Sequence, residues 1–265
     1  MNLDGRAALV TGATGGLGQA IARALHDRGA TLVLSGRRAD VLDPLAASLG
    51  ARAIVAELTD RDDVARLAAE AGDVDVLVAN AGLPADGPVL EYTAEQIDRA
   101  LDVNLRAPIH LARTLAEGMV ARGAGHVVFV SSISGKVATA NSGLYSATKF
   151  GLRGFSSGLR QDLRDTGVGV SCVFPTAISD AGMFADSGAK LPAIARARRP
   201  GDVARAVVRA IERDRHEIDV ADLGTRAWAK AGQIAPAALA RFNHAFGGTD
   251  VAASIAGSEA HRSKR

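Results

Sequence analysis

The chain has 265 residues, 48% of them hydrophobic and 23% charged, which suits one large soluble domain with a well-buried core. Its formal net charge of +2, without a basic block, argues against a nucleic-acid partner, and no apolar run is long enough to span a membrane. The single cysteine, Cys172, cannot form an internal disulfide, which fits a reducing compartment, so we expect a cytoplasmic protein. No His/Cys/acid cluster suggests a metal site. We therefore expect no metal, membrane or nucleic-acid partner.

Short apolar segments alternate with helical patterns over most of the chain. The segments are rich in Val and Leu on both faces, as parallel strands covered by helices are. We therefore predict an α/β fold with a doubly wound parallel sheet, helices on both faces and ligands at the carboxyl ends of the strands. The predicted strands span residues 7–10, 31–35, 51–56, 74–79, 126–131, 168–174 and 216–220. The predicted helices span residues 16–28, 39–49, 62–71, 93–121 (capped by Thr93), 143–165, 201–213 and about 225–246.

A glycine-rich turn joins the first predicted strand to the first predicted helix. Its spacing is Gly12-x3-Gly16-x-Gly18, and it is not a Walker loop because no Gly-Lys-Ser/Thr follows. Glycines allow the backbone to approach a pyrophosphate closely, and the start of the helix offers free N–H groups and a positive dipole end. The turn therefore predicts a phosphate-binding loop, with a tight turn without a ligand as the alternative. The expected cofactor contacts in this loop are Gly12, Thr14, Gly15, Gly16, Leu17 and Gly18.

The second predicted strand leads into Gly36, Arg37 and Arg38 and carries no acid at this point. In a dinucleotide-binding fold an acid here would bind the ribose 2′-hydroxyl, whereas arginine accommodates a 2′-phosphate. Gly36 would leave room for the phosphate, Arg37 would bind it, and Arg38 would stack on the adenine or point to solvent. The sequence thus predicts NADP(H) in preference to NAD(H), and a solvated start to the next helix remains the alternative for both arginines.

Two asparagines occupy positions that need an explanation. Asn80, directly before Ala81 and Gly82, is expected to end its strand through bonds between its side chain and the backbone. Asn104 lies inside an otherwise apolar helical pattern, where asparagine is a poor residue, and Pro108 removes a helical hydrogen bond shortly after it. Without further context, both asparagines can be purely structural.

Ser132 follows the fifth predicted strand, and Tyr145 and Lys149 lie one helical turn apart on one face of a later helix. A neighbouring ammonium favours the phenolate and lowers the pKa of a tyrosine from its usual value of about 10. A tyrosine with such a pKa can transfer a proton near neutral pH. Taken alone, Tyr-x3-Lys is a weak signal.

Together, these residues resemble the short-chain dehydrogenase/reductase family. The resemblance covers about residues 5–220 and implies a Rossmann-type fold with hydride transfer between a nicotinamide cofactor and a carbonyl/alcohol pair. The matching motifs, in the family's order and spacing, are Thr11-Gly12-x3-Gly16-x-Gly18, Asn80-Ala81-Gly82, Asn104, Ser132 and Tyr145-Ser146-Ala147-Thr148-Lys149.

The resemblance implies a role for each of four catalytic candidates. Tyr145 would be the general acid/base, and Lys149 would lower its pKa and bind the nicotinamide ribose. Ser132 would hold the substrate oxygen, and Asn104 would anchor a water that links Lys149 to solvent. Glu57 stands where the family often has Asp, and Thr176 where it usually has Gly. The further cofactor contacts that the resemblance implies are Glu57, Leu58, Asn80, Ala81, Gly82, Pro175, Thr176 and Ile178, together with Tyr145 and Lys149.

Segment 177–200 has few periodic signals and is expected to form a substrate lid, with packing of the loop onto the core as the alternative. We predict an NADP(H)-dependent oxidoreductase that interconverts a hydrophobic ketone or aldehyde and the corresponding alcohol. The alternative is a non-catalytic NADP(H)-binding sensor or regulatory protein. The residues expected to line an apolar pocket are Met183, Phe184 and Leu191, opposite Leu83, Pro84 and Val137.

One catalytic domain is predicted over residues 1–246, with a helical extension at about 222–246 and a partly disordered tail at 247–265. By resemblance, the helices at 93–121 and 143–165 are the dimer-forming pair. We therefore expect a homodimer or homotetramer that binds a small carbonyl or alcohol substrate.

Overall fold

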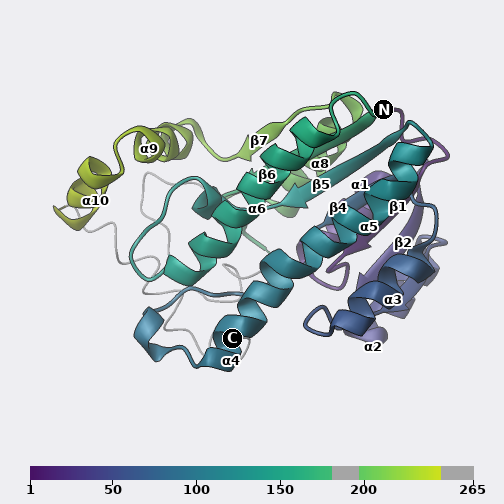
Figure 1. Cartoon of the computed structure of the whole chain (residues 1–265), viewed down its shortest axis with the longest axis horizontal. Coiled ribbons are helices and arrows are strands. Elements are labelled where there is room, and N and C mark those ends of the chain that lie inside the picture. The colour runs from purple at the N-terminus through teal and green to yellow at the C-terminus, as the bar shows by residue number, and fades with distance from the viewer. Residues whose placement is uncertain (181–196, 246–265) are drawn as a thin grey trace.

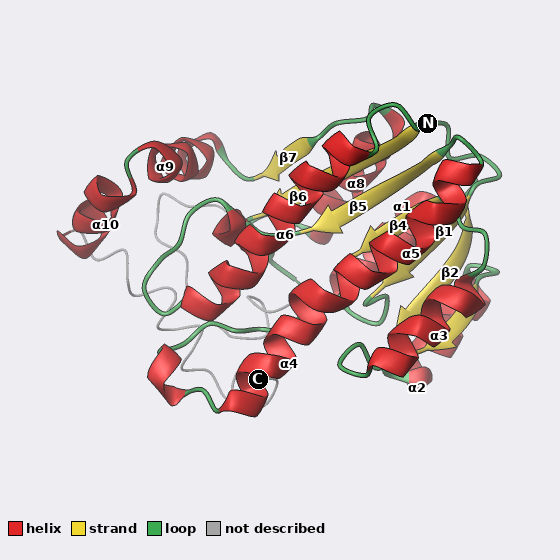
Figure 2. Ribbon diagram, in the orientation of Figure 1, coloured by secondary structure: helices red, strands yellow, loops and turns green. Residues whose placement is uncertain are grey.

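The computed structural model describes residues 1–180 and 197–245 (Figure 1). Seven parallel strands form one central sheet in the order β3-β2-β1-β4-β5-β6-β7 (Figure 2). The strands are β1 (Ala7–Thr11), β2 (Thr31–Gly36), β3 (Arg52–Val55), β4 (Val76–Ala79), β5 (Gly125–Val130), β6 (Val168–Pro175) and β7 (Glu217–Val220). The helices described are α1 (Gly16–His26), α2 (Ala39–Ser48), α3 (Arg61–Ala71), α4 (Ala94–Leu101), α5 (Ala107–Ala121), α6 (Gly143–Asp162), α8 (Pro200–Glu212), α9 (Leu223–Ile234) and α10 (Pro236–Ala245).

Both faces of the sheet are covered, which explains why its strands lack polar alternation. On one face, Val10 and Val128 pack in a core with residues of α1, α2 and α8. On the other face, Leu9, Leu77 and Phe129 pack with residues of α3, α5 and α6, the helices that lie in front of the sheet in Figure 1. The predicted doubly wound parallel sheet is confirmed.

The order of the strands reverses beside β1, which pairs with β2 on one side and with β4 on the other. In such a sheet, ligands bind in the crevice that this reversal opens at the carboxyl ends of the strands. The glycine turn follows β1 and residues 80–82 follow β4. The fold therefore brings these two segments to the same crevice.

Two of the predicted helices are each divided in the structure. The helix predicted at 93–121 consists of α4, a π-helical turn, η2 (Asp102–Arg106), and α5. Its predicted cap is confirmed, since the Thr93 hydroxyl accepts from the Gln96 N–H and the Gln96 side chain accepts from the Thr93 N–H. The helix predicted at about 225–246 is divided into α9 and α10 at Pro236, because proline lacks the N–H that a continuous helix requires.

Helices α9 and α10 form an arm that extends beyond β7, at the left of Figure 1. Three residues of the expected lid were predicted to line the pocket: Met183, Phe184 and Leu191. They lie outside the described residues, and so does the chain from residue 246 onward. Across residues 1–180 and 197–245, no helix combines the length and apolar character needed to cross a membrane. Within the same ranges, no group of three His, Cys, Asp or Glu side chains could hold a metal ion.

Candidate active site

The glycine loop after β1 is shaped for close backbone approach. Gly12 has a φ of +66°, and a Cβ on it would lie 2.7 Å from the Cα of Ala81. A Cβ on Gly18 would lie 2.2 Å from the carbonyl oxygen of Gly12, so α1 packs directly against the turn. Helix α1 starts at Gly16 without a side-chain cap and without an acid in its first turn. These free N–H groups and the absence of a repelling charge fit a pyrophosphate.

Thr11 and Asn80 fasten the two loops of the crevice together. The Thr11 hydroxyl oxygen accepts from the backbone N–H groups of Asn80 and Ala81 at 3.1 and 3.2 Å. The Asn80 side-chain amide donates to the carbonyl oxygens of Thr11 and Gly12 at 3.0 and 3.3 Å. The expected bonding of Asn80 to the backbone is therefore confirmed, and its main partner is the glycine loop.

Arg37 and Arg38 come directly after β2, beside the glycine loop. Arg38 donates to the carbonyl oxygen of Thr14 at 2.7 Å, and Arg37 forms an ion pair with Glu57 at 3.2 Å. The Arg37 and Glu57 side chains are 48% and 40% exposed, so this pair contributes little and the guanidinium can exchange it for another anion. The structure thus brings both candidate arginines and Glu57 to the same end of the crevice, while Leu58 is buried next to Glu57.

The room expected at Gly36 is not present. A Cβ there would lie 2.7 Å from Cγ2 and 3.0 Å from Oγ1 of Thr14. Glycine at this position allows the glycine loop to pack against the end of β2. The expectation of free space at Gly36 was wrong because the glycine loop folds back and places Thr14 beside Gly36. The residues around Gly36 do not show this contact.

A short helical turn, η3 (Ile133–Gly135), orients Ser132 after β5. The Ser132 hydroxyl oxygen accepts from the Ser134 N–H at 3.1 Å, and the Ser132 carbonyl accepts from the Gly135 N–H at 2.8 Å. A Cβ on Gly135 would lie 2.7 Å from the Lys149 carbonyl oxygen. The turn therefore packs tightly against α6 at the level of Lys149.

Tyr145 and Lys149 lie on α6 and face Ser132. The Ser132 hydroxyl lies close enough to the Tyr145 phenol to lower its pKa, and the Lys149 ammonium lies 5.5 Å from the centre of the Tyr145 ring. Lys149 also donates to the Val130 carbonyl at 3.2 Å, and burial lowers its pKa to about 8. The structure thus brings together Ser132, Tyr145 and Lys149.

The expected direction of the Tyr145 pKa is wrong for the protein chain itself. Burial raises the pKa of the phenol, the charge of Asp86 raises it further, and the Ser132 hydroxyl offsets only part of this rise. Lys149 does not reverse the effect, because burial lowers its own pKa to about 8, so that it loses its charge before the phenol ionises. The phenol is consequently protonated at neutral pH.

Asn104 lies in the π-helical turn η2 and is 1% exposed. Its side chain accepts from the Leu83 N–H at 2.6 Å and donates to the Leu83 carbonyl at 2.9 Å. A Cβ on Gly82 would lie 3.5 Å from the Asn104 side-chain oxygen and 3.6 Å from the Lys149 ammonium. Asn104 therefore holds the loop after β4 in the neighbourhood of Lys149.

Pro175 is the last residue of β6, and Thr176 and Ile178 follow it. The Thr176 N–H donates to the Val220 carbonyl at 3.2 Å, so the backbone here keeps to a strand-like path beside β7. Ile178 is buried and bridges to Arg198, where the described chain resumes. These three predicted cofactor contacts thus lie at the start of a segment whose middle is outside the described residues.

Two residues that shape this region were not among the predicted site residues. The Thr11 side chain forms hydrogen bonds with the loop after β4. Its polar side chain at the end of an apolar strand could have indicated such a role from the sequence. Lys136, directly after η3, is buried and paired with two carboxylates. A single lysine between Gly135 and Val137 gives no local sign of burial, because its partners come from β7.

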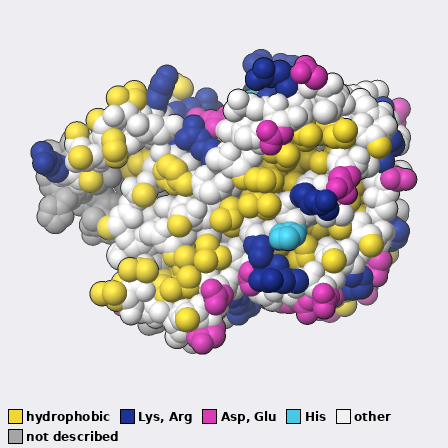
Figure 3. All heavy atoms as spheres, in the orientation of Figure 1, with side chains coloured by type: hydrophobic (Ala, Val, Ile, Leu, Met, Phe, Trp, Pro, Cys, Tyr) yellow, Lys and Arg dark blue, Asp and Glu magenta, His cyan; other side chains and the backbone are white. Residues whose placement is uncertain are grey.

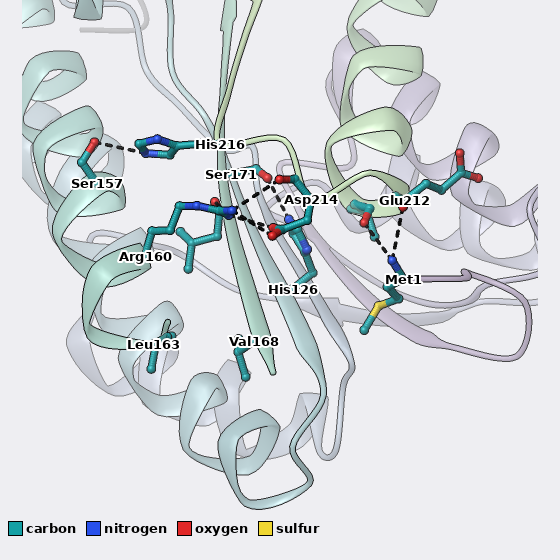
Figure 4. Close-up of polar contacts among 12 residues, drawn as sticks. Met1, His126, Ser157, Arg160, Leu163, Val168, Ser171, Glu212, Asp214 and His216 are labelled. Atoms are coloured by element: carbon teal, nitrogen blue, oxygen red, sulfur yellow. Dashed lines mark hydrogen bonds and ion pairs between the residues drawn. The ribbon is translucent and has the colours of Figure 1, made fainter. Parts of the chain in front are cut away.

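A cavity of about 430 Å³ lies at the opposite, amino end of the sheet. Arg160 and Asp214 form a paired contact on its wall, with His216 and Ser157 beside them (Figure 4). Because none of the predicted site residues lines this cavity, it is separate from the candidate site.

Comparison with known proteins gives a consistent result. The short chain dehydrogenase family matches residues 6–192. Ketoacyl reductase HetN from a Nostoc species is 34% identical over 262 residues, which cover 94% of this chain and 91% of that protein.

Two solved structures also align with the chain. A short-chain dehydrogenase from Sphingobium yanoikuyae in complex with NADPH is 29% identical, with a TM-score of 0.76 over 86% of this chain and 92% of that one. A 3-ketoacyl-(acyl-carrier-protein) reductase from Brucella melitensis complexed with NADH is 26% identical, with a TM-score of 0.73 over 82% of this chain and 97% of that one. The chain belongs to the short-chain dehydrogenase/reductase family, oxidoreductases that act on CH–OH groups with NAD(P)(H).

Proposed function

We propose that this protein interconverts a hydrophobic carbonyl compound and its alcohol with NADP(H), using Tyr145 as the general acid/base. The observation that carries the proposal is that Ser132 and Lys149 both lie beside the Tyr145 side chain: the Ser132 hydroxyl is close enough to lower the pKa of the phenol, and the Lys149 ammonium lies 5.5 Å from the centre of the ring. A phenol and a hydroxyl that meet in this way can share one substrate oxygen, and the adjacent cation favours the phenolate that remains after proton transfer.

Each of the three residues has a distinct part in the proposed reduction. The Ser132 hydroxyl oxygen accepts a hydrogen bond from the Ser134 N–H. The hydroxyl proton of Ser132 can then be donated to the substrate oxygen. Tyr145, protonated at neutral pH, donates its phenolic proton to that oxygen. Lys149, with a pKa of about 8, still carries its charge near neutral pH and stabilises the phenolate. The nicotinamide, when bound, supplies the hydride to the carbonyl carbon.

The substrate class follows from the apolar residues in the loops around these side chains. Leu83 is bonded to Asn104 in the loop after β4, and Val137 lies in the segment between Ser132 and Tyr145. Both side chains are apolar and buried. A ketoacyl group, the substrate in the name of the Nostoc relative, is a carbonyl compound of this kind.

Tyr145→Phe tests the catalytic assignment, because it keeps the ring and removes only the hydroxyl. We expect turnover, followed by the absorbance of the reduced nicotinamide over a panel of ketones and alcohols, to fall by at least about a hundredfold. Cofactor affinity should change little. A variant that keeps most of its activity contradicts the mechanism. A wild type that binds the cofactor but turns over no member of the panel favours a sensor or regulatory protein instead.

Arg37→Ala tests the preference for NADP(H). A hydrogen bond to a charged group is worth about 1.5–3 kcal/mol, so losing Arg37 should weaken NADP(H) binding by roughly ten- to a hundredfold and leave NAD(H) binding nearly unchanged. Gly36→Asp alone should weaken both cofactors, because its Cβ would displace the Thr14 side chain in the glycine loop. Titration of both cofactors decides the matter, and an unchanged NADP(H) affinity in Arg37→Ala would remove Arg37 from the site.

A further inference from the structure

Lys136 is a buried cation directly after the turn that orients Ser132. Its side chain is 7% exposed, and its ammonium lies 2.6 Å from the Asp219 carboxylate and 2.9 Å from the Glu217 carboxylate. It also lies 4.1 Å from the centre of the buried Phe174 ring. Removing an ammonium from water is costly, so a lysine is retained in such a place only where charged partners compensate.

The backbone of Lys136 is part of the Ser132 turn. Its N–H donates to the Ile133 carbonyl at 2.9 Å, directly after the bond from the Gly135 N–H to the Ser132 carbonyl. On the α6 side, the turn is held by Gly135, which packs against the Lys149 carbonyl. The Lys136 side chain holds the other side of the turn, through its two carboxylates on β7.

One of the two carboxylates, that of Glu217, is itself held by α6. Arg153, one helical turn after Lys149, pairs with Glu217 at 2.7 Å and lies 5.7 Å from the Phe174 ring. Burial raises the pKa of Glu217, but hydrogen bonds from Arg153 and Lys136 hold it below its usual value. Two cations and two anions thus connect the Ser132 turn, α6 and β7.

We propose that Lys136 is a positioning residue, whose ion pairs with Glu217 and Asp219 hold the Ser132 hydroxyl against Tyr145. This inference rests on the proposed function, since it assigns Lys136 an effect that passes through Ser132. A lysine that merely stabilises the fold would affect unfolding but would not act on turnover through Ser132.

A double-mutant cycle separates these roles. Lys136→Met keeps the length of the side chain and removes its charge. Ser132→Ala removes the hydroxyl that Lys136 is proposed to position. We expect Lys136→Met to lower kcat about tenfold, because small misplacement of a reacting group is costly, with cofactor affinity within about twofold of the wild type. In the Ser132→Ala background, the same change should alter kcat by less than about twofold. Lys136→Arg, which restores the charge, should recover most of the loss.

Arg160→Met is the matched control. Like Lys136, Arg160 forms a close ion pair, with Asp214 at 2.7 Å, but it lies on α6 at the amino end of the sheet (Figure 4). Its loss should lower the melting temperature and leave kcat unchanged. If Lys136→Met behaves like this control, or if it lowers kcat equally in both backgrounds, the proposal is wrong.

The cycle also distinguishes failure of the inference from failure of the proposed function. A Ser132→Ala variant with nearly wild-type turnover would overturn the proposed function itself. If Lys136→Met does not fold, Asp219→Asn takes its place, since Lys136 then keeps Glu217 as a partner. It should lower kcat by about threefold, again only when Ser132 is present. An equal loss without Ser132, or no loss at all, counts against the proposal.

Discussion

Replacement of Asn104 by alanine would test how the loop after β4 is held in place. The Asn104 side chain is 1% exposed, and it bonds both the N–H and the carbonyl of Leu83, at 2.6 and 2.9 Å. Alanine removes both partners at once. Because Leu83 is itself buried, water cannot readily replace them.

The size of the effect follows from these two bonds. A buried polar group without a partner costs about 1–3 kcal/mol, so two of them cost roughly 2–6 kcal/mol. For a chain of this size, each kcal/mol lowers the melting temperature by about 2–4 °C. We therefore expect Asn104→Ala to melt roughly 10 °C below the wild type.

Thermal unfolding followed by circular dichroism measures this difference. Asn104→Asp keeps an acceptor for the Leu83 N–H and should recover part of the loss. Asn2→Ala, at an exposed asparagine, controls for a loss of side-chain amide at the surface. A melting temperature for Asn104→Ala within about 2 °C of the wild type would show that other contacts hold Leu83, and the reasoning above would fail.

Two further predictions concern the amino end of the sheet and the assembly. Burial lowers the pKa of His126 from 6.5 to about 4 in the folded chain. As the pH falls from about 6.5 to about 4, the unfolded chain therefore binds a proton at this residue that the folded chain does not. The free energy of unfolding should decrease by about 3 kcal/mol over this pH range. Melting temperatures across this range should fall less for His126→Gln, and equal slopes would refute this. We also expect a two-fold dimer through α5 and α6. Hydrophobic side chains gather on the face of the molecule seen in Figure 3, and Val120 of α5 and Phe150 of α6 are 38% and 40% exposed. Light scattering that shows a monomer at micromolar concentration would contradict it.

The parts of the fold that depend on local pattern could be predicted from the sequence. Strands such as β5 are apolar on both faces, and Gly12 and Gly18 mark the turn between β1 and α1, so their places follow from neighbouring residues alone. Pro108 signalled a weak point in the helix predicted at 93–121, but the π-helical turn and the bonds between Asn104 and Leu83 could not be predicted, because Leu83 lies on a separate loop.

The candidate site shows the same distinction. The spacing of Tyr145 and Lys149 places them on one helix face, and the structure agrees. The direction of the Tyr145 pKa was wrong because burial, which the spacing does not reveal, raises it. Lys136 was missed because Glu217 and Asp219, its partners, lie far along the chain.

The two outer strands of the sheet, β3 and β7, have a consequence for the behaviour of the protein in concentrated solution. Each is only four residues long, and each carries charge, with Arg52 on β3 and Glu217 and Asp219 on β7. Long, flat, apolar edges recruit strands from other molecules, whereas short charged edges discourage such pairing. The short, charged strands β3 and β7 therefore mark the two places where the sheet stops growing, and they disfavour edge-to-edge aggregation.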